Sequence, residues 1–302
     1  MDLKKVFLII LLLITQNIYA QKLPTYRNLV MEGGGIKGIA YGGAMLALEE
    51  NGVLQDITRV AGTSAGAISA SLLAIGYSAQ DISDIIADTP VESFNDDGFV
   101  SRGTRRLIND YGWFKGESFL NTMENIIYKR TGNANLTFLE LHRLASSYPF
   151  RDLYVVGADL SDQKSVVFSY ETYPNMRIAD AVRVSMSIPI YYKAVWLNSE
   201  GKVFDVPTPK DNCHLFVDGG ILMNFPIEIF DNTKYLTGEE GTYDVFNKET
   251  IGLRLERMEQ INHEVENGTG SAPFEIIDLN SYMSALGSVL MRNVHPAHPE
   301  DI

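Results

Sequence analysis

The chain has 302 residues with 38 acidic and 25 basic side chains, so its formal net charge is −13 at pH 7. With 45% hydrophobic and 21% charged residues, it has the composition of a globular protein and not of a disordered chain. The acidic balance argues against nucleic acid as a partner, because phosphate binding requires a basic face. A single cysteine excludes an intramolecular disulfide framework and a cysteine-built zinc site.

The N-terminus has the pattern of a secretory signal peptide. Lys4 and Lys5 precede an uninterrupted apolar run over residues 6–14, and a short polar stretch then ends in Ala20. The run is too short for a membrane span, which needs about 20 apolar residues. We therefore expect residues 1–20 to be a signal peptide that is cleaved between Ala20 and Gln21. The mature protein, residues 21–302, is then expected to be secreted or periplasmic and to form one domain.

Strand and helix patterns alternate along the rest of the chain. Short apolar runs indicate buried strands at 28–31, 57–61, 153–158, 165–170, 215–217 and 250–255. Helical patterns cover 38–51, 67–75, 117–130, 138–145 and 177–187, with a further helix within 274–292. This alternation predicts an α/β fold in which a mostly parallel sheet is covered on both faces.

Local signals add detail to this outline. Ser78 with Asp81, and Thr137 with Glu140, have the spacing of capping boxes that begin helices. The segment 89–116 mixes glycine, aspartate, asparagine and aromatic residues without a sustained period. We interpret it as an irregular insertion.

A glycine-rich motif, Gly33-Gly34-Gly35-Ile36-Lys37-Gly38, follows the first predicted strand and opens a helix. Consecutive glycines at a helix start let backbone amides converge on an anion. The same residues match the dinucleotide fingerprint G-x-G-x-x-G, which expects an acidic residue at the end of the next strand. Asp56 has nearly that spacing but precedes the strand. Taken alone, the motif leaves nucleotide binding open.

Two further motifs follow predicted strands. Gly62-Thr63-Ser64-Ala65-Gly66 has the G-x-S-x-G pattern of a nucleophile elbow, in which a serine projects from a sharp turn between a strand and a helix. Val217-Asp218-Gly219-Gly220 presents a carboxylate at a strand end, although an Asp-Gly pair taken alone is more typical of an ordinary turn. All three motifs are expected at strand ends, where open α/β sheets place their sites.

Together and in this order, the three motifs resemble those of the patatin-like phospholipases, in a bacterial, secreted form. The segment Ser185-Met186-Ser187-Ile188-Pro189 and the pair Asn224 and Pro226 are similar to further landmarks of that family. The resemblance spans about residues 28–226. It implies a three-layer α/β/α sandwich and a catalytic domain with lipid acyl hydrolase activity.

The resemblance also implies a Ser–Asp dyad, with Ser64 as nucleophile and Asp218 as proton acceptor. Oxyanion stabilisation is assigned to the backbone amides of Gly33, Gly34, Gly35 and Ala65. Small residues that shape the motifs complete the candidate site: Gly38, Gly62, Gly66, Gly219 and Gly220. The implied substrate is a phospholipid or another acyl-ester lipid, met in transient contact with a membrane surface. No cofactor and no metal is expected.

Three alternatives stay open at the level of sequence. A dinucleotide-binding oxidoreductase would use the Gly33–Gly38 loop and leave Ser64 without a role. A Ser–Asp–His α/β-hydrolase would recruit His263, His295 or His298, which follow Asp218 in the order such enzymes use. A catalytically silent lipid-binding protein would keep the pocket without turnover.

The insertion carries the remaining signals. Its aromatic residues either pack it onto the core or form a lid or interfacial surface over an acyl pocket; they are Phe94, Phe99, Trp113, Phe114 and Phe119. The negative net charge disfavours attraction to anionic membranes except at a local basic cluster. Arg102, Arg105 and Arg106 form one such cluster, which we interpret as solvated.

Overall fold

The computed structural model describes residues 25–89, 91–268 and 271–277, together with 281, 282, 285, 286, 288 and 289. The expected signal peptide, residues 1–20, lies outside the described residues, as does much of the helix expected within 274–292. Within these ranges, every helix is too short or too polar to span a bilayer.

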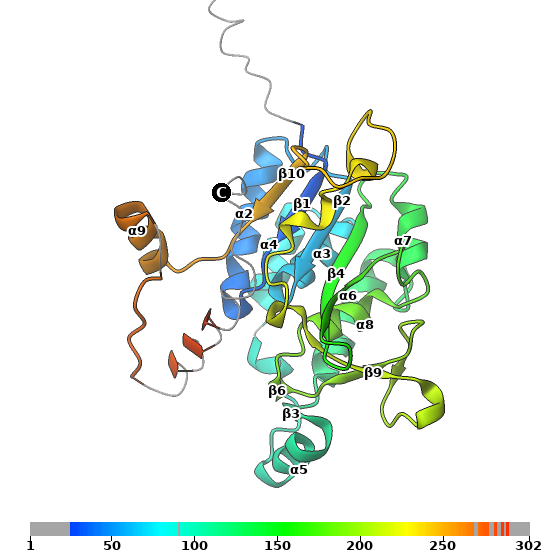
Figure 1. The fold of residues 1–302 in the computed structure, drawn as a ribbon, viewed down its shortest axis with the longest axis vertical. Helices are drawn as coiled ribbons and strands as arrows, with labels where there is room; N and C mark the ends of the chain where they lie inside the picture. Colours follow the sequence, from blue (N-terminus) through cyan, green and yellow to red (C-terminus); the bar gives the residue numbers. More distant parts are fainter. Residues whose placement is uncertain are drawn as a thin grey trace, which may run out of the picture.

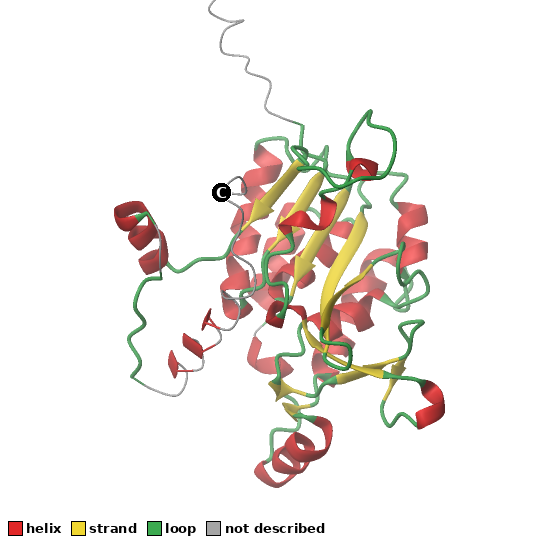
Figure 2. Ribbon diagram, viewed as in Figure 1, coloured by secondary structure: helices red, strands yellow, loops and turns green. Residues whose placement is uncertain are grey.

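A central sheet, with eight strands in the described part of the chain, organises the molecule (Figures 1 and 2). Its strand order is β10-β1-β2-β4-β9-β7-β8, and β5 pairs with the other edge of β4. The parallel part consists of β1 (Asn28–Met31), β2 (Arg59–Thr63), β4 (Asp152–Asp159) and β10 (Thr250–Leu253). Antiparallel pairing adds β5 (Lys164–Phe168), β7 (Val195–Leu197), β8 (Val203–Phe204) and β9 (His214–Asp218).

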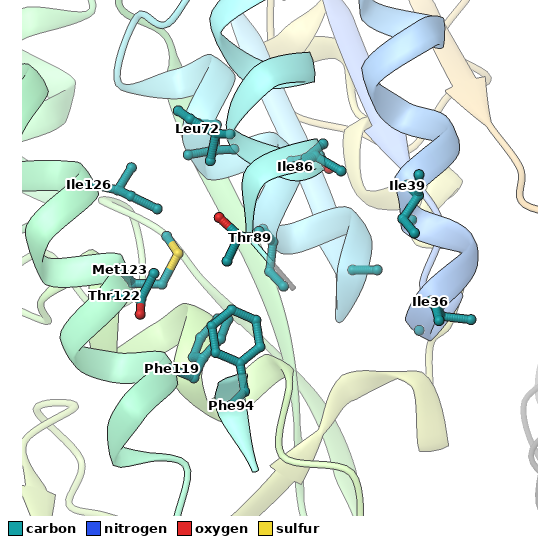
Figure 3. Close-up of a pocket in the computed structure, with 16 residues that line it drawn as sticks. Ile36, Ile39, Leu72, Ile86, Thr89, Phe94, Phe119, Thr122, Met123 and Ile126 are labelled. Carbon is teal, nitrogen blue, oxygen red and sulfur yellow. The ribbon is translucent and has the colours of Figure 1, made fainter. Parts of the chain in front are cut away.

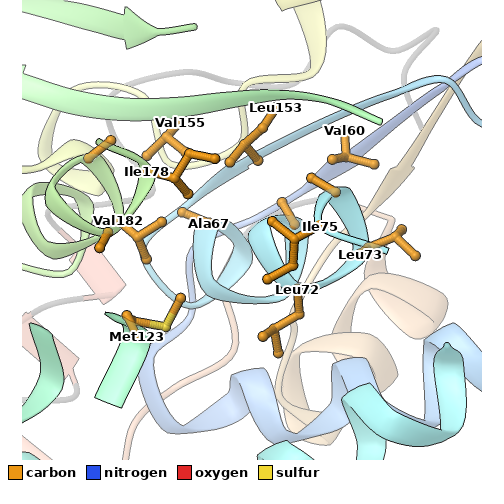
Figure 4. Packing of buried hydrophobic residues seen from close by; sticks show 14 of the residues in the cluster. Val60, Ala67, Leu72, Leu73, Ile75, Met123, Leu153, Val155, Ile178 and Val182 are labelled. Carbon is orange, nitrogen blue, oxygen red and sulfur yellow. The ribbon is translucent and has the colours of Figure 1, made fainter. Parts of the chain in front are cut away.

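Helices cover one face of this sheet. Alternate strand residues such as Leu153 and Val155 are buried in one core with apolar side chains from the helices (Figure 4). The contributing helices are α2 (Ala40–Glu50), α3 (Ala65–Ala74), α4 (Ala79–Asp88), α6 (Glu117–Thr131), α7 (Phe138–Leu144) and α8 (Ile178–Ser185). Almost all of α3 is buried, as its apolar sequence predicts.

The opposite face has a thinner cover. Val30, Ala61 and Tyr154 point to this side, where they pack against Phe230 and Tyr235 from two 3-10 helices, η5 (Ile227–Phe230) and η6 (Thr233–Tyr235). The predicted α/β class, with a central, mostly parallel sheet between two layers, is confirmed, and its second layer consists of short 3-10 helices and loops.

The predicted capping boxes are confirmed at two helix starts. The hydroxyl of Ser78 accepts from the Asp81 amide and begins α4, and Thr137 with Glu140 begins α7 in the same way. The expected helix at 38–51 is divided into a 3-10 helix, η1 (Gly35–Ile39), and α2.

The segment 89–116 is more regular than the sequence indicates. It contains η2 (Val91–Phe94), helix α5 (Val100–Asp110) and β3 (Gly112–Phe114), which pairs with β6 (Ile190–Tyr192). The interpretation as an irregular insertion is therefore wrong. Its apolar period is hidden because the buried residues of α5 are Gly103 and Arg106. A Cβ on Gly103 would lie 2.6 Å from the Trp113 indole, so the absence of a side chain permits this packing.

Two strands meet end to end along one edge of β4. β2 pairs with residues 152–156 and β9 with residues 157–159, while β5 occupies the other edge over 155–159. Thr63, the last residue of β2, lies opposite Val156, and Asp218, the last residue of β9, lies opposite Gly157. Because the two strands run toward each other, the residue after Thr63 and the side chain of Asp218 come together.

Candidate active site

Ser64 lies in the sharp turn between β2 and α3. Its backbone has φ 52° and ψ −121°, a region that residues with a Cβ rarely adopt, and its side chain is almost fully buried. The flanking glycines permit this turn. A Cβ on Gly62 would lie 2.4 Å from the Gly66 carbonyl group, and one on Gly66 would lie 2.3 Å from the Met31 carbonyl oxygen. The predicted elbow geometry is present, and its two glycines are required by close backbone contact.

Asp218 is the direct partner of this serine. The Ser64 hydroxyl donates a 2.7 Å hydrogen bond to Oδ2 of Asp218, and the Gly220 amide donates to Oδ1 at 2.8 Å. Both donors favour the ionised carboxylate, but complete burial outweighs them and raises the pKa of Asp218 to about 7. Gly219 lets the turn pack closely, since a Cβ there would lie 2.4 Å from the Val156 carbonyl oxygen.

The C-terminal end of α8 contacts both residues. The Ser64 amide donates to Oγ of Ser185 at 2.9 Å, and the Asp218 amide donates to the Ser187 carbonyl oxygen at 2.9 Å. Both serines are fully buried, and Arg183 donates to the Ser187 hydroxyl. The contacts of this segment with Ser64 and Asp218 were not predicted from the sequence. Two closely spaced serines at the end of a predicted helix, just before Pro189, were the available signal.

Gly33, at the start of the glycine loop, is hydrogen-bonded to Asn224. The Gly33 amide donates to the Asn224 carbonyl oxygen at 3.0 Å, while Nδ2 of Asn224 donates to the Gly33 carbonyl oxygen and to Glu32, both at 3.1 Å. A Cβ on Gly33 would lie 2.4 Å from Oδ1 of Asn224. The assignment of the Gly33 amide to an oxyanion site is therefore corrected, because this amide already has a backbone acceptor.

The other predicted amide donors remain without an acceptor. The backbone amides of Gly34, Gly35 and Ala65 donate no hydrogen bond to any part of the chain that the structure describes. Gly38 brings the loop against the start of α3, because a Cβ on it would lie 2.7 Å from the Ala65 Cβ. Ala65 is the first residue of α3, where the helix dipole adds positive partial charge. Backbone amides without an acceptor at a helix start are suited to binding an anion.

An apolar pocket opens beside Ala65 and the glycine loop (Figure 3). Among the described residues that line it, none is charged. In Figure 3, Ile36 and Ile39 lie on one side of the pocket and Ile126 on the other. The lining comes from the glycine loop, α3, α4, η2 and α6: Gly35, Ile36, Gly38, Ile39, Ala65, Ile68, Ser69, Leu72, Ile85, Ile86, Thr89, Phe94, Phe119, Thr122, Met123 and Ile126.

The described histidines lie away from the Ser64–Asp218 pair. His142 contacts Asp152 at 2.7 Å, and His214 contacts Asp159 at 2.8 Å. His263 is near Asn267 within α9 (Met258–Asn267), and His295 and His298 lie outside the described residues. The direct contact between Ser64 and Asp218 leaves no histidine between them.

One group in the described part of the chain has the composition of a metal site. The ligand atoms of Asp159, Asp162 and His214 lie within 4.8 Å of one another. Asp159 already accepts from two backbone amides and contacts His214, while Asp162 pairs with Lys164. Protein partners thus account for the three side chains.

Comparisons with known proteins find relatives of this chain. The family model for patatin-like phospholipases matches residues 29–231. The uncharacterized protein YqhO of Bacillus subtilis is 32% identical over 220 residues, which cover 69% of this chain and 68% of that protein. A probable lipid hydrolase, 463L of Invertebrate iridescent virus 6, is 27% identical over 212 residues, which cover 70% of this chain and 65% of the viral protein.

Among solved structures, VipD from Legionella pneumophila shares the fold. It superposes with a TM-score of 0.50 at 18% sequence identity, and the match covers 80% of this chain. The present chain spans about half of VipD, since the match covers 52% of that structure. The matched family region contains all three motifs, and the chain belongs to the patatin-like phospholipase family.

Proposed function

We propose that this protein is a serine lipid acyl hydrolase of the phospholipase A or esterase type, which cleaves carboxylic ester bonds with a Ser64–Asp218 dyad. The observation that carries the proposal is the 2.7 Å hydrogen bond from the Ser64 hydroxyl to Asp218. A hydroxyl that donates directly to a buried carboxylate has its proton acceptor in place before substrate arrives.

In the acylation step, Oγ of Ser64 attacks the ester carbonyl carbon while its proton passes to Asp218. The resulting oxyanion is stabilised by the amides of Gly34, Gly35 and Ala65, and the loss of one such donor typically costs about 3 kcal/mol of transition-state stabilisation. As the tetrahedral intermediate collapses, the ester bond breaks and Asp218 returns the proton to the leaving alkoxide. The acyl group then remains on Ser64.

In the deacylation step, Asp218 accepts a proton from water, whose oxygen attacks the acyl carbonyl carbon. Collapse breaks the bond to Oγ, the proton returns to Ser64, and a fatty acid is released. An aspartate with an ordinary pKa near 3.9 is a weak base toward a hydroxyl. The burial that raises the pKa of Asp218 to about 7 makes it a better match to that task.

The apolar pocket supports a lipid substrate. It begins at Ala65 and the glycine loop, so an acyl chain bound in it has its ester carbonyl near Ser64. A lining without charge is suited to a hydrocarbon chain, whose burial contributes about 0.8 kcal/mol per methylene group. A phospholipid or another acyl-ester lipid has both required parts.

The alternatives fit less well. An oxidoreductase would leave the Ser64–Asp218 contact without a role, and family membership supports a hydrolase. A histidine-dependent triad has no histidine beside Asp218 among the described residues. A silent lipid-binding protein is separated from an enzyme only by turnover.

The test measures fatty acid release from dispersed phosphatidylcholine and from a soluble short-chain ester. We expect release by the wild type, none by Ser64→Ala and a loss of at least about a thousandfold in Asp218→Asn. His263→Ala and His298→Ala serve as controls and are expected to keep the wild-type rate. Undiminished release by Ser64→Ala would rule out the proposed mechanism, and inactive histidine variants would favour the triad.

We also propose that residues 1–20 are removed on export. N-terminal sequencing of the protein secreted or recovered from a periplasmic fraction is expected to begin at Gln21. A mature protein that begins at Met1 would contradict this.

A further inference from the structure

Helix α5 carries an exposed apolar stripe. Val100, Thr104 and Ile108 follow one another at helical spacing, and Tyr111 lies one turn beyond them. Phe99, also exposed, directly precedes the helix as its N-cap residue. Phe99, Val100 and Ile108 are 72%, 74% and 70% exposed. We call these five residues the α5 stripe. Isolated apolar residues are ordinary on a surface, but an aligned row on one helix marks an interaction site.

Basic side chains flank the stripe. Residues 99–115 carry four basic side chains and one acidic side chain in a chain with a net charge of −13. Arg102 and Arg105 are exposed. Arg102 pairs with Asp97 at 3.2 Å and lies over the Phe99 ring, whereas Arg105 forms no ion pair within the described residues. The structure separates Arg106 from this exposed set, because its guanidinium is buried and binds Asp97 at 2.6 Å. The stripe and its two exposed arginines have the amphipathic pattern of helices that lie in a membrane interface.

The placement of α5 connects it to the pocket. The rings of Phe94 and Phe119 both line the pocket and contact each other edge to face, with centroids 5.1 Å apart. The chain leaves the pocket wall at Phe94, forms α5 and returns at Phe119. In Figure 1, α5 projects at one end of the molecule, beyond the helices that cover the sheet.

A second set of contacts holds the base of this projection. Arg183 donates to the Lys115 carbonyl oxygen at 2.6 Å and also to Ser187, whose carbonyl oxygen accepts from the Asp218 amide. The Asp96 carboxylate accepts hydrogen bonds of 2.7 to 3.0 Å from the backbone amides of residues 116–118, at the start of α6. The segment that follows α5 is therefore connected to Asp218 by hydrogen bonds through Arg183 and Ser187.

We propose that the α5 stripe docks on the surface of an anionic phospholipid bilayer, with its apolar side chains in the interface and Arg102 and Arg105 at the headgroups. Charge complementarity selects this occupant, because a positive patch on an acidic protein is attracted to anionic headgroups while the rest of the chain is repelled. The inference deepens the proposed function and rests on it. Docking brings the rim of the pocket to the lipid that supplies the substrate.

The test separates docking from catalysis by using Ser64→Ala protein throughout. Co-sedimentation is measured with vesicles of equimolar phosphatidylcholine and phosphatidylserine, and with vesicles of phosphatidylcholine alone. We expect binding to the anionic vesicles and a partition coefficient at least about tenfold lower for Val100→Glu/Ile108→Glu. The matched control is Ile261→Glu/Val265→Glu, which makes the same change on exposed positions of α9 and is expected to bind like its parent.

A second comparison tests the contribution of positive charge. It compares Arg105→Glu with the control Arg143→Glu, which changes an exposed arginine on α7. We expect Arg105→Glu to weaken binding to anionic vesicles about tenfold and to change binding to phosphatidylcholine vesicles little. Melting temperatures of all variants establish that they are folded, and size-exclusion chromatography reports self-association.

Several results would overturn the proposal. They are failure of the Ser64→Ala parent to bind anionic vesicles, equal loss in the α9 control, and undiminished binding by Val100→Glu/Ile108→Glu. A parent dimer that only the α5 variants dissociate would assign the stripe to a second copy instead. None of these results bears on hydrolysis of a soluble ester, so the proposed function and the docking surface can fail independently.

Discussion

The main-chain amide of Ser64 donates a 2.9 Å hydrogen bond to the hydroxyl oxygen of Ser185, the last residue of α8. This contact holds a residue whose φ of 52° is strained. Two residues after Ser185, the Ser187 carbonyl oxygen accepts a hydrogen bond from the Asp218 amide. The C-terminal end of α8 therefore fixes the separation of Ser64 and the Asp218 carboxylate. A rigid support of this kind matters for a reaction that depends on a single short hydrogen bond.

Removal of the Ser185 hydroxyl is expected to impair turnover more than binding. Ser185→Ala leaves the buried Ser64 amide without an acceptor, so we expect kcat to fall about ten- to a hundredfold while KM changes by less than about threefold. The control is Ser71→Ala, which removes another buried hydroxyl whose partner, the Ile68 carbonyl oxygen, is local. Steady-state kinetics on a soluble ester measure both variants, and equal loss in the two would deny Ser185 a positioning role.

The strain at position 64 predicts a stability difference between two inactive variants. Glycine adopts a positive φ without steric cost, so Ser64→Gly is expected to be about 1 kcal/mol more stable to unfolding than Ser64→Ala. At Ser71, inside α3, the order is reversed and alanine is the more stable by a similar amount. Urea denaturation of the four variants measures this. An advantage of alanine at both positions would contradict strain at the elbow.

Turnover is expected to depend on pH through Asp218. Burial raises the pKa of its carboxyl group to about 7, and only the ionised form accepts the serine proton. The value of kcat/KM is therefore expected to rise with pH, reach its half-maximum near 7 and level off above it. A flat profile between about pH 5 and 9 would contradict the role of Asp218 as base.

The same pKa makes a prediction about stability. The pKa of Asp218 is higher in the folded protein than in the unfolded chain, so its neutral carboxyl group stabilises the folded state relative to the ionised form. This contribution to the free energy of unfolding is fully present below about pH 4 and is lost as the pH rises through about 7. Asp218→Asn keeps a neutral side chain at every pH. Its melting temperature is thus expected to exceed that of the wild type by several degrees at about pH 8, and this difference is expected to shrink toward pH 4. A difference that grows on acidification would contradict the sign of the shift.

The pocket predicts a limit on acyl chain length. Ile126 lies across the pocket from the glycine loop, so Ile126→Phe fills space that the end of a long chain would occupy. We expect kcat/KM for a long-chain ester to fall about tenfold relative to a short-chain ester. Ile126→Leu conserves volume and is expected to keep the wild-type ratio. A ratio that is also unchanged in Ile126→Phe would place the acyl chain elsewhere.

Much of this architecture follows from local sequence. The strand at residues 28–31, the elbow at Ser64 and the turn at Asp218 were predictable, because apolar runs that stop at glycines indicate strand ends. The capping boxes at Ser78 and Thr137 were also predictable, because the two partners in each box lie only three residues apart.

Other features depend on contacts that no short segment contains. The Gly33 amide is bound by Asn224, which is distant in sequence, and this contact removed it from the predicted oxyanion donors. Helix α5 was missed because Val100 and Ile108 face outward and its buried positions are Gly103 and Arg106. Apolar periodicity predicts a helix only when burial causes the pattern.

The most direct test of the dyad is the rate of covalent labelling by a fluorophosphonate, with the modified residue located by mass spectrometry. We predict that the wild type is labelled on Ser64, that Ser64→Ala is not labelled, and that Asp218→Asn reacts at least about a hundredfold more slowly. Labelling of Ser64→Ala at the wild-type rate, or of Asp218→Asn without any slowing, would contradict the account.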